Sequence, residues 1–210
     1  MNKIENIIEK LADDTRPVCP LKPLSRFCCW SVISIVFLAI VIVFVGIRPD
    51  ISVKLESMAF MAEMMLAIAA GLLSALAAHW LSLPDGGQKK WIYWLPFVPL
   101  TVLFFFAAYQ YFITPMNFAL GKVWVSCAND VALMALVPAI IIFLLIKYAA
   151  STKNLLTSVM AMTAVASFSY LSSRLICGND DINHLLLWHY FPAIIVALIG
   201  AFLGNKLLRW

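Results

Sequence analysis

Residues 27–47 read FCCWSVISIVFLAIVIVFVGI, a stretch without a single charged side chain. An α-helix needs roughly 20 apolar residues to cross the hydrocarbon core of a bilayer, and this stretch meets that length. It is too long for the core of a signal peptide, and no small-residue cleavage motif follows it. We therefore expect it to be a retained membrane helix.

Five further apolar stretches follow, and turn-forming or charged residues separate them. The six predicted spans are residues 27–47, 59–83, 91–111, 128–148, 155–176 and 185–207. Hydrophobic residues make up 63% of the chain and charged residues 12%, a balance too apolar for the surface of a soluble protein. The sequence thus predicts an all-α polytopic membrane protein with six transmembrane helices over 27–210, preceded by a short segment over 1–26.

The basic residues predict the orientation of the chain. Eleven of the 15 Lys and Arg residues fall in the N-terminal segment, the C-terminal tail and the loops on the same side. The other four, Arg48, Lys54, Lys122 and Arg174, fall on the opposite side. Because basic loops stay in the cytoplasm, we expect both termini to be cytoplasmic. The net charge of +4 without a Lys/Arg run argues against direct binding of nucleic acid.

The N-terminal segment has the pattern of a short amphipathic helix. Its apolar residues recur at helical spacing and are Ile4, Ile7, Ile8 and Leu11. Three prolines between residues 17 and 23 then favour an extended stalk. A helix this short is marginal in water, so its apolar stripe requires a surface. The mixture of acidic and basic residues disfavours the membrane surface, which leaves a partner's groove or the chain's own bundle.

The outward loops collect residues with thiol, imidazole and carboxylate groups. They include Cys127, Cys177, Asp181, His184 and His189, which we take as a candidate metal set. These groups suit soft-metal binding or redox sensing. The spacing is not that of a closed zinc site, and two histidines five residues apart do not share one face of an α-helix well.

Structural interpretations of the same residues stay open. Cys127 and Cys177 can form a plain disulfide in an oxidising compartment. Asp130, Asp180 and Asp181 can cap the outer ends of spans four and six. Within span two, Glu63 is expected to pair with Arg48 or Lys54 as a structural ion pair.

Several pieces of the chain together resemble a known family. The first pieces are Leu11-Ala12-Asp13-Asp14 followed by Pro17-Val18, Gly46-Ile47-Arg48-Pro49-Asp50, Ser82-Leu83-Pro84, Trp94-Leu95-Pro96 and Ser126-Cys127. The tail adds Cys177, Asp181, His184-Leu185-Leu186-Leu187-Trp188-His189, Pro192, Gly200-Ala201, Leu203-Gly204 and Leu207-Leu208-Arg209-Trp210. Over nearly its whole length the chain resembles the NrsF-type six-helix membrane anti-sigma factors, which restrain extracytoplasmic-function (ECF) sigma factors in bacteria.

The resemblance implies a location in the bacterial inner membrane and an ECF sigma factor as partner. The sigma-binding residues it implies, together with the apolar stripe, are Ile4, Ile7, Ile8, Leu11, Asp14, Pro17 and Val18. The resemblance also implies that Cys127 and Cys177 sense the inducing signal, by oxidation or by transient capture of a heavy-metal ion. No catalytic residue and no resident cofactor are expected. Cys19, Cys28 and Cys29 match no family motif.

Two other functions are alternatives for a small polytopic membrane protein. A membrane thiol–disulfide oxidoreductase normally needs cysteines poised for exchange, often as a Cys-x-x-Cys pair, and the sequence has none. A small transporter is typically built from internal repeats, and spans one to three show no detectable duplication in spans four to six. Both functions therefore rank below the anti-sigma factor.

Overall fold

The computed structural model describes residues 3–13, 21–84, 86, 91–114, 125–149 and 151–208. All regular secondary structure in these residues is helical, and six helical segments are long and apolar enough to cross a membrane. The segments are Pro23–Val45, Met58–Leu81, Trp91–Ile113, Cys127–Lys147, Asn154–Ile176 and Ile182–Leu207. The predicted all-α fold with six spans is confirmed.

The helices differ from the predicted spans mainly at their ends. The long helices are α2 (Pro23–Val45), α4 (Met58–Leu81), α6 (Phe97–Ile113), α7 (Val125–Lys147), α8 (Asn154–Ile176) and α10 (Phe191–Leu207). The short elements are α1 (Lys3–Asp13), α3 (Ile51–Leu55), α5 (Trp91–Trp94), α9 (Ile182–Leu185) and the π-helical turn η2 (Leu186–Tyr190). Helix α2 begins earlier than predicted, because Pro23 suits the first turn of a helix. The third span is divided before Pro96, which lacks an amide donor.

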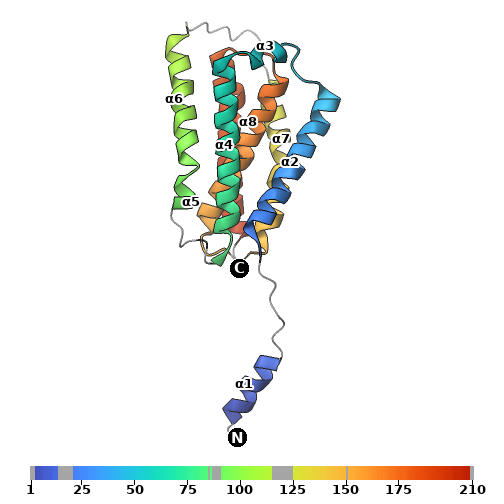
Figure 1. Ribbon diagram of the computed structural model, residues 1–210, viewed down its shortest axis with the longest axis vertical. Coiled ribbons are helices and arrows are strands. Elements are labelled where there is room, and N and C mark those ends of the chain that lie inside the picture. Colours follow the sequence, from blue (N-terminus) through green and yellow to red (C-terminus); the bar gives the residue numbers. More distant parts are fainter. Residues whose placement is uncertain are drawn as a thin grey trace.

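Helix α8 is the centre of the bundle. It packs most extensively on α4, α10 and α7, whereas α2 packs on α4 and α7. Helix α6 packs chiefly on α4 and stands at the edge of the bundle (Figure 1). We call the end that carries α3 the α3 end; α2 and α8 both finish there. At the opposite end, the stalk end, α2 begins and α10 finishes (Figure 1).

Small residues let α4 and α8 approach closely. Ala67, Gly71 and Ala75 are all buried along one side of α4. A Cβ atom added at Gly71 would lie 3.3 Å from the Cβ atom of Ser167 on α8. Close backbone approach is a main source of helix association in lipid, so this stripe fixes the packing of the two helices.

Side-chain hydrogen bonds hold the stalk end of the bundle together. The hydroxyls of Ser151 and Thr157 donate to the backbone carbonyl of Leu81, at 3.2 and 3.3 Å. The Trp30 indole N–H donates to the carbonyl of Pro138 at 3.0 Å, which ties α2 to α7. These bonds satisfy polar groups that burial would otherwise leave unpaired.

The predicted amphipathic helix is present as α1. Its side chains Ile7, Ile8 and Leu11 are 52%, 60% and 64% exposed, so no described part of the bundle covers the apolar stripe. Asp14, Pro17, Val18 and Cys19 lie outside the described residues, and so does the side chain of Ile4.

The contact at Gly71 generates a stability prediction. Replacing Gly71 with Leu forces a branched side chain between α4 and α8 and should destabilise the fold by about 1–3 kcal/mol. Thermal unfolding of the purified protein in detergent measures the loss. Leu72→Ala is the matched control, because Leu72 is 40% exposed on the same helix and its truncation should change stability far less. Equal melting temperatures for Gly71→Leu and wild type would contradict the packing described.

Candidate functional site

Two groups of polar side chains lie at the α3 end, and the segment 177–184 contributes to both. One group contains two cysteines and two histidines, and the other is a network of ion pairs. Cys177, Asp180 and His184, which belong to the two groups, thus lie within eight consecutive residues.

Cys127, Cys177, His184 and His189 come together although they derive from three elements and a loop. The two sulfur atoms are 3.7 Å apart, and the Cys177 sulfur is 3.4 Å from Nε2 of His184. The Nε2 atoms of His184 and His189 are 3.2 Å apart. All four candidate ligand atoms lie within 4.8 Å of one another, and His189 is fully buried. These are four of the five residues of the predicted metal set.

The π-helical turn explains how two histidines five residues apart reach one site. Within η2 the amide of Phe191 donates to the carbonyl of Leu186, a bond to the fifth residue back. Such a turn brings residues five apart onto one face, which an α-helix does not. Pro192 follows immediately and has no amide with which to tighten the turn. The expectation that His184 and His189 do not share a face is therefore wrong.

Ser173 contacts the ring nitrogen of His189 that faces away from the cluster. The Ser173 hydroxyl lies within hydrogen-bond distance of the carbonyl of Tyr170, at 2.8 Å. Its oxygen also lies 2.7 Å from Nδ1 of His189, and it accepts a hydrogen bond from that nitrogen in the tautomer with the proton on Nδ1. The Nε2 lone pair of His189 is then directed at the cluster. Metal-binding histidines are oriented in this way by a partner on the other ring nitrogen.

Three of the six distances among the four atoms match those of a tetrahedral metal site, and all six are within 4.8 Å. With bonds of about 2.3 Å to sulfur and about 2.0–2.1 Å to nitrogen, ligand atoms lie about 3.8 Å apart for two sulfurs, about 3.5 Å for sulfur and nitrogen and about 3.3 Å for two nitrogens. The corresponding distances in the structure are 3.7, 3.4 and 3.2 Å. A disulfide requires sulfur atoms about 2.05 Å apart, so oxidation would draw the two cysteines together.

The structure places the three predicted aspartates outside the group of four clustered residues. Asp181 is not among the four clustered residues, although it belonged to the predicted metal set. It precedes α9, but its side chain makes no capping hydrogen bond. Asp130 lies inside α7, beyond the first turn, and Asp180 is held by ion pairs. The capping interpretation is therefore wrong for Asp130 and Asp180, whereas Asp181 stands at the N-cap position of α9 without a capping hydrogen bond.

Asp180 is the centre of the ion-pair network. Its carboxylate lies 2.7 Å from the guanidinium groups of Arg48 and Arg174, and 2.8 Å from the Lys54 ammonium. Arg48 also bonds both carboxylate oxygens of Asp50 at 2.7 and 2.8 Å. The network joins the segment after α2, helix α3 and the end of α8.

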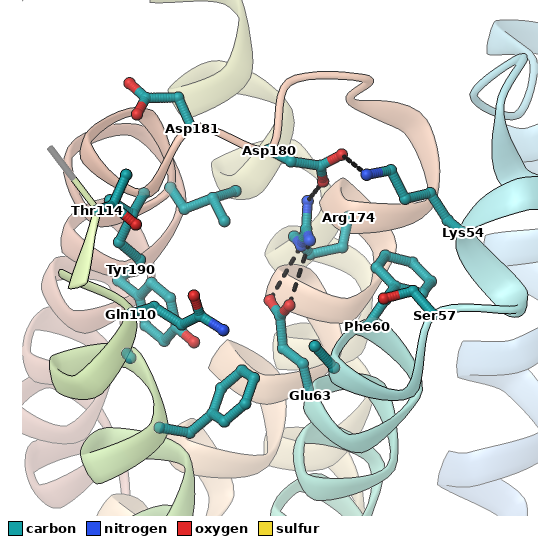
Figure 2. Close-up of a pocket in the computed structure, with 15 residues that line it drawn as sticks. Lys54, Ser57, Phe60, Glu63, Gln110, Thr114, Arg174, Asp180, Asp181 and Tyr190 are labelled. Carbon is teal, nitrogen blue, oxygen red and sulfur yellow. Dashed lines mark hydrogen bonds and ion pairs between the residues drawn. The ribbon is translucent and has the colours of Figure 1, made fainter. Parts of the chain in front are cut away.

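Glu63 extends this network into the bundle. It accepts hydrogen bonds from Arg174 at 3.0 and 3.2 Å (Figure 2). It also accepts one from the Tyr170 hydroxyl. The Phe60 ring lies beside two guanidinium groups, 5.7 Å from Cζ of Arg48 and 5.2 Å from Cζ of Arg174. The prediction that Glu63 is structural agrees with this geometry. Its predicted partners, Arg48 and Lys54, are wrong, because both reach Asp180 instead.

The Asp180 carboxylate stays ionised over the physiological pH range. Burial opposes ionisation of Asp180, but hydrogen bonds from Arg48, Lys54 and Arg174 outweigh it and hold the pKa of the carboxyl well below its ordinary value. A lowered carboxyl pKa stabilises the fold above the ordinary value, and that contribution is lost only in acid below it. Asp180 is therefore not a switch for neutral pH.

Comparison with known proteins assigns the chain to a family. The family model described as "Negative regulator of sigma F" (NrsF) matches residues 11–210. The chain belongs to the NrsF family. No curated protein and no solved structure matches it. The matched range confirms the predicted resemblance and contains every residue of the cluster and of the ion-pair network.

Membership of the NrsF family makes the protein a negative regulator of a sigma factor, with a sigma factor as partner. The match begins at Leu11, the last residue of the apolar stripe in α1. The more N-terminal stripe residues therefore depend on the amphipathic pattern and on their exposure rather than on the family match.

The sequence predictions missed Arg174 as a functional residue, although a signal existed. Arg174 and Glu63 both lie in apolar spans, and isolated charges in such spans are costly unless they meet a partner. Pairing every intramembrane charge with one of opposite sign would have suggested this contact. No comparable sequence pattern pointed to the contact between Ser173 and His189.

The buried ion pair generates a prediction for this NrsF-family protein. Arg174→Ala leaves the Glu63 carboxylate buried without its cation and should destabilise the fold by about 3–5 kcal/mol. Chemical unfolding of the detergent-solubilised protein measures this. Lys54→Ala is the control, since its partly exposed ion pair should contribute below about 1 kcal/mol. Equal losses for the two variants would refute the distinction between the pairs.

Proposed function

We propose that the protein is an anti-sigma factor of the bacterial inner membrane that sequesters an ECF sigma factor on the cytoplasmic side and releases it on an envelope signal. Both termini are cytoplasmic in this proposal, so the α3 end faces outward. The protein acts by binding, not by catalysis. A redox or heavy-metal signal acts at Cys127 and Cys177.

The observation that carries the proposal is the separation of two features by the length of the bundle. The exposed stripe of α1 precedes α2 at the stalk end, whereas the cysteine–histidine cluster lies at the α3 end (Figure 1). An amphipathic helix with an uncovered apolar face suits insertion into a groove of a partner protein. A protein with a binding helix on one side and reactive thiols on the other is suited to transmitting a signal.

Two signal chemistries are compatible with the cluster. A two-electron thiol oxidant such as diamide would convert the two thiols to one disulfide, with loss of two protons and transfer of two electrons to the oxidant. Alternatively, Cys127, Cys177, His184 and His189 would hold a soft divalent ion such as Cd²⁺ or Zn²⁺. Either event constrains the segment 177–184 and thereby moves Asp180.

Helix α2 offers a direct route to the sigma-binding segment. The amide of Arg48 donates to the carbonyl of Leu175 at 3.0 Å, and the Arg48 guanidinium binds Asp180. A shift of the segment after α8 therefore pulls on the outer end of α2, whose other end leads into the stalk. A signal needs to favour the releasing state by only about 1.4 kcal/mol to weaken sigma binding about ten-fold.

The binding role of α1 is tested by charge substitution on its apolar stripe. Ile8→Glu and Leu11→Glu should each reduce co-purification of the sigma factor encoded near this gene by at least about ten-fold, because a carboxylate would be buried in an apolar groove. Glu9→Gln on the same helix is the control and should retain binding. Unchanged binding by both Glu variants would exclude the stripe as the sigma-binding surface.

The metal site is tested by ligand substitution in the full-length protein. We expect Cd²⁺ to bind at about one ion per chain and to give thiolate-to-metal charge-transfer absorption. His189→Ala should weaken binding strongly, and Ser173→Ala by about 10-fold or more through loss of the orienting hydrogen bond. Asp181→Asn should bind as wild type does. Charge-transfer absorption that survives in the Cys127→Ser/Cys177→Ser variant would place the ion elsewhere.

A further inference from the structure

An apolar cavity lies between α6 and the side of the bundle that α8 and α10 form. Its volume is about 550 Å³, and α4, α6, α8 and α10 all contribute to its walls. Helix α6 packs chiefly on α4, and within the described residues it has no extensive contact with α8 or α10. The cavity fills the space between α6 and those two helices, and the proposed sensing mechanism does not use it.

Apolar side chains predominate in the lining of this cavity. Small buried residues contribute to it from three helices, namely Ala67, Ala107 and Ala193, and larger aliphatic and aromatic side chains complete the walls. The hydroxyls of Thr163 and Tyr170, which also line the cavity, already donate hydrogen bonds within the chain. A buried water needs two to four polar partners, whereas an apolar cavity stays dry and takes up apolar molecules. The lining therefore favours a hydrocarbon occupant over water.

The cavity borders the surface that faces lipid. Phe104 and Phe112 of α6 are 68% and 82% exposed, and Ile194 and Leu198 of α10 are 53% and 66% exposed. All four side chains line the cavity and belong to segments that are long and apolar enough to cross a membrane. The wall of the cavity is therefore continuous with the lipid-facing surface of the bundle, and a hydrocarbon chain can enter between α6 and α10.

The length and position of the cavity match the acyl region of one leaflet. Its lining on α6 extends from Leu100 to Phe112, about 18 Å along the helix at 1.5 Å per residue. Half of a hydrocarbon core about 30 Å thick is about 15 Å. These residues form the half of the third span that is nearer the α3 end (Figure 1). The space therefore suits one acyl chain of a lipid in the leaflet at the α3 end.

We propose that this cavity binds one acyl chain of a phospholipid from the leaflet at the α3 end, and that the bound chain supports the π-helical turn η2. Leu186 and Tyr190, the first and last residues of η2, both line the cavity. The chain therefore packs against the turn that brings His184 and His189 together. Lipid binding itself is independent of sigma binding and metal binding; only its bearing on sensing rests on the proposed function.

Native mass spectrometry of the full-length protein in mild detergent tests the binding site. We expect one phospholipid per chain, with phosphatidylethanolamine and phosphatidylglycerol of identical acyl chains retained alike, because the cavity contacts the chain and not the headgroup. Ala108→Phe on α6 and Ala197→Phe on α10 should each reduce retention by about five-fold or more, since the ring takes the volume of the chain. Val102→Phe and Ile199→Phe on the same helices are the matched controls, because these residues are 48% and 56% exposed and do not line the cavity.

Hydrogen–deuterium exchange tests the contact with η2. Adding phospholipid to the delipidated protein should slow amide exchange in residues 186–190 by about five-fold or more, and the two cavity-filling variants should not show this effect. Exchange that lipid leaves unchanged in the wild type would overturn the support of η2. Retention that is equal in the wild type and in either purified cavity-filling variant would overturn the binding site. So would a dimer that added lipid does not dissociate but both cavity-filling variants abolish, because a second copy would then be the occupant. Sigma binding is measured separately and decides none of these outcomes.

Discussion

The ion pair between Arg174 and Glu63 is the interaction on which the α3 end depends. A guanidinium buried inside a bundle of apolar helices must meet a carboxylate, because an unpaired charge there is costly. Arg174 is 3% exposed and bonds Glu63 on α4 and Asp180 after α8. These bonds fix the axial position of α4 relative to α8 and hold the connection after α8 in place. The close approach at Gly71 and the bonds to the Leu81 carbonyl fix the same two helices further along.

The cysteine–histidine cluster is assembled on this rigid base. Cys177 follows α8 directly, and Ser173, one turn before it, orients His189 through Nδ1. The π-helical turn then brings His184 and His189 together. Because the segment 177–184 carries Cys177, Asp180 and His184, the thiols and the ion pairs are mechanically joined. Arg48 extends the connection to α2, and α2 leads toward the amphipathic helix.

Much of the fold was predictable, since long uncharged runs and the breakers between them define six spans without reference to tertiary contacts. The family was predictable from the motifs around Arg48, Cys127 and the C-terminal helix. The candidate residues of the cluster were predictable by type, but their convergence was not. Its geometry depends on a π-helical turn, and the 3.6-residue period of an α-helix separates His184 from His189. The partner of Glu63 was also missed, because the choice among Arg48, Lys54 and Arg174 depends on how far α4 is shifted along its axis relative to α8. The number of residues between two side chains does not determine that axial shift.

The central claim is that oxidation of Cys127 and Cys177, or metal binding by them, lowers the affinity of α1 for a sigma factor at the other end of the bundle. The direct measurement is the sigma-factor Kd of the full-length protein in lipid nanodiscs, with and without saturating Cd²⁺ or diamide on the α3 face. The account predicts that Kd rises about ten-fold with either agent, and that the Cys127→Ser/Cys177→Ser variant keeps the resting Kd. A Kd that stays constant while the cysteines are shown to be metallated or oxidised would contradict it.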